Sequence, residues 1–253
     1  MLNIRNAASI FELDAKLWGL LPRQALVILL IPMLIVLAMV AAVPFFEVFV
    51  WITGEDSLIE SLQFLFLLGT GLTFIRLAFI LGRRSRLGTV LCVLAALAVF
   101  FVSGEEIAWG QRFFGWETPE NLKALNYQDE TTLHNIGSAH QLSIYAVMLA
   151  GMYGSLVPLL HLSRPAGRGA SILRYLLVPP LCLVPAFIMP FGYRLTRLVL
   201  PLEEWFPYLV FPITKFSEVT ELCLYFALFS FAWLNLRRLK KENSLDGPSN
   251  ETT

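Results

Sequence analysis

The segment from Gly104 to Asn135 holds the side chains most capable of chemistry in this chain of 253 residues. Glu105 and Glu106 are adjacent, and Glu130 precedes His134 by four residues, a spacing that brings two side chains together on one face of a helix. Carboxylates and an imidazole can act as general acids and bases. Ionisable groups at the edge of a bilayer are costly to desolvate, and we therefore interpret this segment as a functional site.

Candidate roles follow from the chemistry of each side chain. The residues expected to transfer protons are Glu105, Glu106 and His134. The residues expected to contact a substrate are Trp109, Gln111, Arg112 and Asn135. Among these, the guanidinium of Arg112 suits an anionic headgroup, because it binds carboxylate or phosphate oxygens in a bidentate manner.

Carboxylates at other helix ends are expected to join this segment if the helices form a bundle. Asp56 and Glu60 are the supporting pair. A divalent metal ion is a candidate cofactor, since carboxylate oxygens with an imidazole suit zinc, manganese or iron. The candidate ligands are Glu106, Glu130, His134, Glu218 and Glu221. The Glu-to-His spacing differs from that of di-iron bundles, so the sequence leaves the presence and identity of the metal open.

Helix capping is an alternative explanation for several of these carboxylates. Acidic side chains in a first helical turn complement the helix dipole, and Ser57 and Ser217 are expected N-caps for the helices that carry Glu60 and Glu218. The pair Glu105–Glu106 differs, because it follows an apolar run and so lies at a helix C-terminus, which repels anions. This pair needs a nearby cation or proton, and Arg112 is the expected partner if the helix continues past it.

The rest of the chain is apolar enough to place it among membrane proteins. Hydrophobic residues make up 57% and charged residues 15%, with a mean hydropathy of +0.66. About 20 residues are needed to cross ~30 Å of hydrocarbon. Six runs are near this length or longer, at 25–46, 58–81, 87–103, 139–162, 171–192 and 218–236, and the third is short unless its helix continues past Gly104. The predicted fold is all-α: a polytopic transmembrane helix bundle within a single domain, 1–241, followed by a disordered tail, 242–253.

Three other segments carry specific expectations. Before the first span, Ser9 and Glu12 have capping-box spacing, which predicts an interfacial helix on the membrane surface. The fifth span contains four prolines and should be kinked. The segment 193–216 contains three more, which predicts a re-entrant or surface-lying excursion.

The distribution of charge predicts the orientation in the membrane. Of 19 basic residues, 14 lie at the termini or in the 2–3 and 4–5 connections, while 14 of 19 acidic residues lie on the opposite side. The positive-inside rule then places both termini in the cytoplasm and the Gly104–Asn135 segment outside, in a plasma (inner) membrane. Nothing in this distribution suggests nucleic-acid binding.

One long pattern resembles a known group of proteins. GEEIAWGQR at 104–112, ETPE at 117–120 and the spacing of Asn126, Gln128, Glu130, His134 and Asn135 resemble a family of bacterial multi-pass membrane proteins whose activity is uncharacterised. The resemblance implies a multi-pass helical protein and supplies no activity. A looser resemblance, to membrane hydrolases of the alkaline ceramidase and progestin-receptor type, lacks their several histidines and one span.

Three functions fit these observations. The first is a hydrolase or transferase, with or without a metal, that acts on a lipid or lipid-linked substrate from the outer side. The second is a non-enzymatic scaffold or partner-binding protein, in which carboxylates tie to Arg112, Arg194 and Arg197. The third is a proton- or cation-coupled transporter. The sequence leaves the substrate and the oligomeric state open.

Overall fold

The computed structural model describes residues 4–54, 57–123, 131–133, 136–162 and 171–245, and these contain helices and no β-strand. Six helical segments are long and apolar enough to cross a membrane, which makes this a multi-pass helical protein. They span Pro22–Ala42, Phe46–Leu81, Arg86–Glu106, Gly137–Leu160, Ile172–Val199 and Pro207–Glu242.

The elements follow one another with short connections. In the first half they are α1 (Ile4–Leu17), α2 (Pro22–Ala42), α3 (Phe46–Thr53), α4 (Leu58–Leu81), α5 (Arg86–Glu106), the 3-10 turn η1 (Ala108–Gly110), α6 (Gln111–Phe114) and α7 (Glu120–Lys123). In the second half they are α8 (Gly137–Leu160), α9 (Ile172–Leu177), η2 (Leu181–Leu183), α10 (Val184–Val199), α11 (Leu202–Trp205), η3 (Pro207–Leu209) and α12 (Val210–Leu245).

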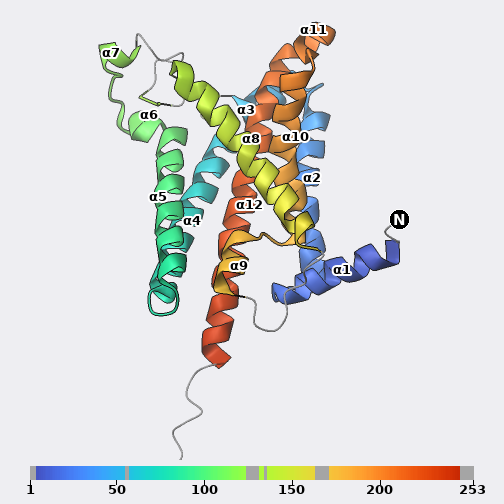
Figure 1. Cartoon of the computed structure of the whole chain (residues 1–253). Coiled ribbons are helices and arrows are strands. Elements are labelled where there is room, and N and C mark those ends of the chain that lie inside the picture. Colours follow the sequence, from blue (N-terminus) through green and yellow to red (C-terminus); the bar gives the residue numbers. More distant parts are fainter. Residues whose placement is uncertain (1–3, 55–56, 124–130, 134–135, 163–170, 246–253) are drawn as a thin grey trace, which may run out of the picture.

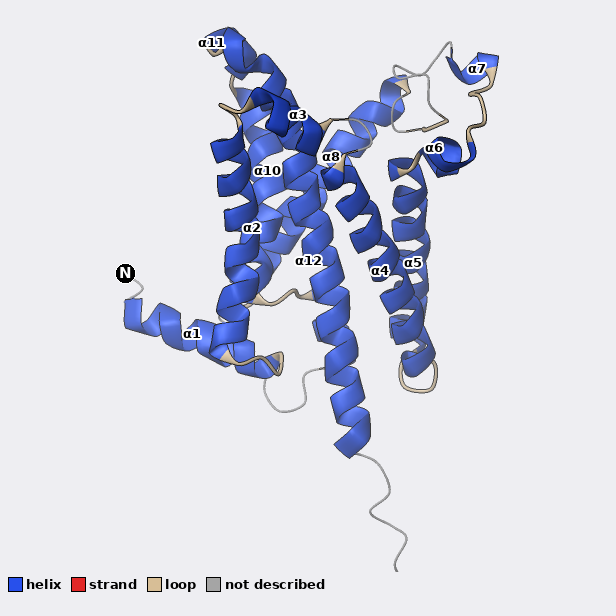
Figure 2. Ribbon diagram, turned by 180° about the vertical axis from the view of Figure 1, so that it is seen from behind, coloured by secondary structure: helices blue, strands red, loops and turns tan. Residues whose placement is uncertain are grey.

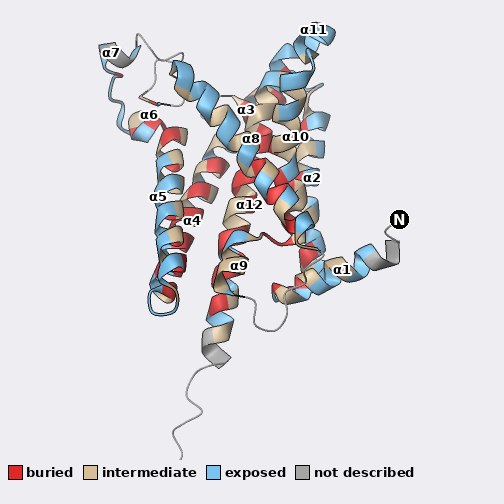
Figure 3. Ribbon diagram, in the orientation of Figure 1, coloured by how far each residue is buried: buried red, intermediate tan, exposed pale blue. Residues whose placement is uncertain are grey.

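Helix α12 is the centre of the bundle (Figure 1; Figure 2). It has the largest buried share of any span, and it packs against α4 on one side and α10 on the other. The outer helices pair with these two, α5 with α4 and α8 with α10. Buried positions gather along the inward faces (Figure 3), while Phe79, Leu97 and Leu142 are more than half exposed, as expected for helices that face lipid tails.

Two glycines on α8 allow its close approach to α10. A Cβ atom at Gly151 would lie 2.7 Å from the carbonyl oxygen of Phe187 and 2.9 Å from the amide nitrogen of Phe191. One at Gly154 would lie 2.2 Å from the Phe187 ring. Small residues of this kind let membrane helices pack backbone to backbone.

Helix α1 runs across the end of the bundle rather than along it (Figure 1). It is anchored by Trp18, which is 4% exposed and packs edge-on against Tyr175 with ring centroids 5.4 Å apart. The helix begins at Ile4, so the capping box predicted at Ser9 and Glu12 is wrong and Ser9 lies within the helix. Short cap patterns also occur inside helices, where propagation from an earlier turn overrides them.

The prolines act as predicted in one segment and not in the other. The fifth span breaks between Leu177 and Leu181, giving α9, η2 and α10. The excursion predicted for 193–216 is wrong over most of its length, because α10 continues to Val199 and α12 begins at Val210. Pro212 falls in the first turn of α12, where a proline removes no helical hydrogen bond.

Two smaller boundaries also differ from expectation. Ser217 is not an N-cap, since it lies two turns inside α12 and its hydroxyl donates to the carbonyl of Thr214. The predicted tail is helical as far as Leu245, and residues 246–253 lie outside the described part of the chain. By contrast the cap predicted at Ser57 is confirmed, because its Oγ accepts the amide of Glu60 at 3.3 Å.

Candidate functional site

Four carboxylates from three helices come together at one end of the bundle, where α5 ends and α4 and α12 begin (Figure 1). They are Glu60 of α4, Glu106 of α5, and Glu218 and Glu221 of α12, and we call them the carboxylate cluster. Each of the other three is near enough to Glu106 for their charges to interact. The predicted convergence of these helix ends is therefore present for the described residues.

Glu106 is oriented by a hydrogen bond to the centre of the bundle. The hydroxyl of Tyr225 donates to Glu106 Oε1 at 2.9 Å, and Tyr225 is itself 5% exposed. Tyr225 lies one turn beyond Glu221 on α12, so both side chains point to the same face of that helix. A phenol and a carboxylate held at this distance can exchange or share a proton with a third group.

Gln63 links α4 to α12 next to the carboxylate cluster. Its Nε2 donates to the carbonyl oxygen of Glu218 at 2.9 Å and to Glu218 Oε2 at 3.4 Å. Both partners accept hydrogen bonds, so the amide can have only this orientation, which turns Oε1 away from Glu218. Gln63 is fully buried, and its Oε1 has no hydrogen-bond partner among the described residues.

Ser103 provides a second buried polar atom on the same side of α5. It precedes Glu106 by three residues and so shares its helix face, and it is 3% exposed. Its Oγ has no hydrogen-bond partner in the described structure. Buried polar groups are nearly always satisfied by protein, water or ligand. The cluster is therefore lined by groups able to bind a further polar or cationic species.

Positive charge around the cluster is limited to two residues in the described part of the chain. Arg194 of α10 forms an ion pair with Glu221, and both side chains are largely buried, at 12% and 16% exposed. Lys215 attracts Glu218 electrostatically. The described residues therefore bring four carboxylates and two cations together at this end of the bundle.

Glu105 performs a different task from its neighbour. It is 5% exposed, and both of its oxygens accept hydrogen bonds from the connection that follows α5. Oε1 accepts from the indole nitrogen of Trp109 at 2.6 Å, and Oε2 accepts from the amide of Leu133 at 2.7 Å. Adjacent residues point about 100° apart on a helix, which explains why one carboxylate faces the cluster and the other faces the loop.

The turn that brings Trp109 back to Glu105 has an uncommon backbone. Ala108, Trp109 and Gly110 have φ values of 46°, 54° and 86°, so two of three consecutive left-handed residues carry a side chain. Such residues cost of order 1–2 kcal/mol each and persist only where other contacts hold them. Gly104 makes room for the indole, since a Cβ atom there would lie 2.9 Å from it.

Gln111 completes the connection. Its Nε2 donates to the hydroxyl of Thr118 at 2.8 Å, and its Oε1 accepts the amide of Thr131 at 2.8 Å. The residues predicted to bind substrate therefore include two, Trp109 and Gln111, that hold the loop to itself and to α5. Helix α5 ends at Glu106, so the condition under which Arg112 was expected to partner Glu105 and Glu106, a helix that continues past it, is not met.

Several predicted site residues lie outside the described structure. They are Asp56, Glu130, His134 and Asn135, together with the side chain of Arg112. Within the described ranges, no group of three or more histidine, cysteine, aspartate or glutamate side chains is placed to hold a metal ion. The ligand set that includes Glu130 and His134 thus stays a prediction. The predicted ion pairs of the outer arginines are present, Arg194 with Glu221 and Arg197 with Glu203.

Two residues of the site were not anticipated from the sequence. Gln63 and Tyr225 lie in apolar runs that read simply as spans. The available signal was position, because Gln63 follows Glu60 by three residues and Tyr225 follows Glu221 by four, which places each on a helix face already marked by a carboxylate.

Comparison with known proteins does not extend this description: no protein-family model, curated protein or solved structure matches the chain. The function is therefore inferred from the geometry of the site.

Proposed function

We propose that this protein is a membrane-embedded hydrolase or transferase that acts on a lipid or lipid-linked substrate, with Glu106 as its general acid and base. The observation that carries the proposal is the pairing of Glu106 with the Tyr225 hydroxyl inside a cluster of three further carboxylates. Acid–base groups positioned this way, at the end of a membrane span, suit proton transfer to a substrate headgroup at the interface.

In this proposal each group of the cluster has a separate task. Glu106 takes a proton from the attacking water, or from the acceptor hydroxyl in a transfer, and returns it to the leaving oxygen. Tyr225 fixes the carboxylate and can donate to an oxygen that gains charge. The carboxylate oxygens of the cluster can bind a cationic group of the substrate or a divalent ion. The strained turn and Glu105 hold the start of the connection that follows α5.

The proposed orientation places the cluster on the extracytoplasmic side. It rests on the positive-inside distribution of basic residues, with both termini cytoplasmic, and on α1 as an interfacial helix. Candidate substrates are then lipids of the outer leaflet of the plasma (inner) membrane and lipid-linked molecules presented there.

The test is a search for turnover with purified full-length protein. The protein would be incubated in mixed micelles with a bacterial membrane lipid extract, and lipid masses would be followed over time. We expect one lipid class to lose or exchange a headgroup. Glu106→Gln should abolish this change, and Tyr225→Phe should slow it by about ten- to a hundredfold, as for other general-acid or electrostatic partners.

The control is Glu203→Gln. Glu203 is also a carboxylate at this end of the bundle and is also paired with an arginine, but it is 45% exposed and outside the cluster. Turnover should be unchanged in this variant. A wild-type protein that alters no lipid in the extract, or a Glu106→Gln variant that retains full turnover, would refute the proposal.

Proton- or cation-coupled transport is the second candidate, and one observation favours it. Gln63 Oε1 and Ser103 Oγ are buried without partners among the described residues, and they lie beside the carboxylate cluster, an arrangement that can bind a dehydrated cation. In proteoliposomes, flux of a cation or proton that depends on Glu106, in the absence of lipid turnover, would favour transport over catalysis.

A further inference from the structure

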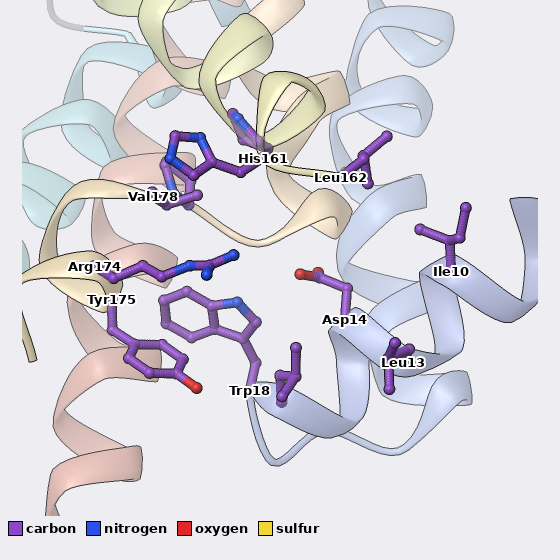
Figure 4. Close-up of a pocket in the computed structure, with 12 residues that line it drawn as sticks. Ile10, Leu13, Asp14, Trp18, His161, Leu162, Arg174, Tyr175 and Val178 are labelled. Carbon is purple, nitrogen blue, oxygen red and sulfur yellow. The ribbon is translucent and has the colours of Figure 1, made fainter. Parts of the chain in front are cut away.

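A second polar site lies at the opposite end of the bundle from the carboxylate cluster, between α1, the end of α8, and α9 (Figure 4). The pocket is lined by apolar and aromatic residues together with an aspartate, a histidine and an arginine. These are Asp14 of α1, His161 after α8 and Arg174 of α9. None of them belongs to the site described above.

The charged side chains of the pocket come from different helices. The Asp14 carboxylate and the Arg174 guanidinium extend from opposite walls and face each other, with the indole ring of Trp18 alongside (Figure 4). The ring of His161 lies on the same side as Arg174 (Figure 4). Its Nδ1 is 2.9 Å from the carbonyl oxygen of Val157, which can only accept, so Nδ1 carries a proton and Nε2 remains for a ligand.

The walls that carry these groups are fixed to the bundle. Asp14 Oδ2 accepts the amide of Leu181 at 2.8 Å, which ties α1 to η2. Tyr175 packs against Trp18 on one side and lies beneath the guanidinium of Arg238, 3.3 Å from its ring centroid, on the other. Because these elements are already fixed by contacts with the bundle, little conformational entropy is lost when a ligand binds to the pocket.

We propose that this pocket binds the phosphoethanolamine headgroup of a membrane lipid, with the phosphate at Arg174 and His161 and the ammonium at Asp14. A guanidinium donates to phosphate oxygens, and the Nε2 of His161 does so as well when the imidazole is protonated, while a carboxylate accepts hydrogen bonds from a primary ammonium. A purely anionic headgroup would bring its charge toward Asp14 without a cation to offset it. A choline headgroup has no N–H to donate to that carboxylate.

A lipid is favoured over a soluble phosphoethanolamine because of what surrounds the charges. The remaining lining is apolar and includes Ile10, Leu13, Leu17, Leu162 and Val178. Leu13 is 50% exposed at the edge of the pocket. Acyl chains would cover such surface, whereas a soluble ligand would leave it in water. Tryptophan and tyrosine beside the headgroup are also typical of the membrane interface.

The pocket makes the binding of an ammonium depend on pH. Burial raises the pKa of Asp14 to about 6, opposed by the hydrogen bond from Leu181 and by the charge of Arg174. The groups that face Asp14 are Arg174 and Tyr175 from α9, His161 from α8 and Cys182 from η2. Below pH 6 the protonated Asp14 no longer attracts an ammonium, so the preference for phosphatidylethanolamine over phosphatidylglycerol, which share the phosphate contacts, should fall as the pH is lowered from 7 to 5.

The experiment measures lipid binding to the full chain. Protein in phosphatidylcholine nanodiscs would receive phosphatidylethanolamine, phosphatidylglycerol or free phosphoethanolamine, and retained lipid would be counted by native mass spectrometry, with thermal unfolding as a second readout. We expect preferential retention of phosphatidylethanolamine and a rise in melting temperature. Asp14→Asn should lower that affinity about tenfold or more, the loss expected for one charge-assisted hydrogen bond, and should not weaken the binding of phosphatidylglycerol.

Matched variants separate the site from general effects of charge. Arg174→Gln should weaken binding of every phospholipid, whereas the exposed Arg83→Gln and Glu12→Gln should change nothing. Equal retention of phosphatidylglycerol and phosphatidylethanolamine, or an unchanged preference in Asp14→Asn, would overturn the proposal. Free phosphoethanolamine that binds as well as the lipid would overturn the lipid assignment. If Asp14→Asn does not fold, the pH dependence of the wild type decides, and a preference for phosphatidylethanolamine over phosphatidylglycerol that stays constant between pH 7 and pH 5 refutes the role of Asp14.

Discussion

Replacing Glu105 with glutamine should loosen the connection between α5 and α8. The carboxylate offers two acceptors to two donors, the Trp109 indole and the Leu133 amide. Glutamine keeps one acceptor and presents an NH2 group to the other donor, so one hydrogen bond becomes a donor–donor contact. The side chain is nearly the same size, and packing should therefore be preserved.

The magnitude follows from the kind of bond that is lost. A hydrogen bond to a charged group contributes about 1.5–3 kcal/mol, so we expect a loss of about 2 kcal/mol from the local stability of the loop. At about 1.4 kcal/mol per factor of ten, this corresponds to roughly thirtyfold faster opening of the Leu133 amide. The backbone strain at Ala108 and Trp109 acts in the same direction, since those hydrogen bonds are what offset it.

Hydrogen exchange of the Leu133 amide in detergent micelles measures this opening directly. The matched control is Glu117→Gln, an exposed carboxylate of the same connection, which should leave exchange unchanged. A double-mutant cycle with Trp109→Phe should return a coupling energy of about 1 kcal/mol or more between the two side chains. Equal exchange rates in wild type and Glu105→Gln, or equal acceleration in Glu117→Gln, would show that Glu105 does not hold the loop.

Three further predictions test other parts of the molecule. Gly151→Ala should destabilise the protein by about 1–3 kcal/mol in thermal unfolding, because its Cβ would meet the backbone of α10. The control Gly192→Ala has open space around the new Cβ and should be neutral. Equal melting temperatures for the two variants would contradict the close approach of α8 to α10. For Asp14, the pKa of about 6 in the folded state lies above its ordinary value of 3.8, so the folded state binds the proton more tightly, and its contribution to stability is present at low pH and lost as pH rises through 6. The melting temperature should then increase between pH 7 and pH 5, by the equivalent of about 1 kcal/mol, and Asp14→Asn should remove that dependence. If the cluster holds a divalent metal, elemental analysis of the purified protein should find it in the wild type and not in Glu106→Gln or His134→Ala, and undiminished metal in both variants would exclude the predicted ligands.

The spans could be predicted from the sequence because they need only length and low polarity. The α5 helix shows the limit of that reasoning. The apolar run of this span was expected to end near residue 103. The helix nevertheless continues through Glu105 and Glu106, because both side chains accept hydrogen bonds from distant segments. Hydropathy counts the cost of desolvating a side chain and carries no information on partners that the fold supplies.

The end of the α10 segment was mispredicted for a related reason. The three prolines of the 193–216 segment were taken to exclude a regular span there, but the effect of a proline depends on its position in a helix. Pro185 and Pro212 fall in first turns, where the missing N–H has no partner to lose. A sequence gives the position of a proline in the chain and not its position in a helix, so the boundaries at Val199 and Val210 required the structure.

For the site, the convergence of the carboxylates could be predicted from the sequence, but the different contacts of Glu105 and Glu106 could not. Glu105 and Glu106 are equivalent in the sequence pattern. Only the rotation of α5 against α4 and α12 decides which of them faces Tyr225 and which faces the loop. That rotation is set by the packing of side chains such as Cys92 and Ala96 against α4 and α12, a property of the whole bundle.

The length of α12 has a mechanical consequence. One uninterrupted helix carries Glu218 and Tyr225 of the carboxylate cluster near its start and Arg238, which stacks on Tyr175 beside the Asp14 pocket, twenty residues later. At 1.5 Å per residue, Glu218 and Arg238 are joined by a rod of about 30 Å, the thickness of the hydrocarbon layer. The two sites therefore share one helix. If their ligands are coupled through it, reciprocity requires each ligand to change the affinity for the other by the same factor.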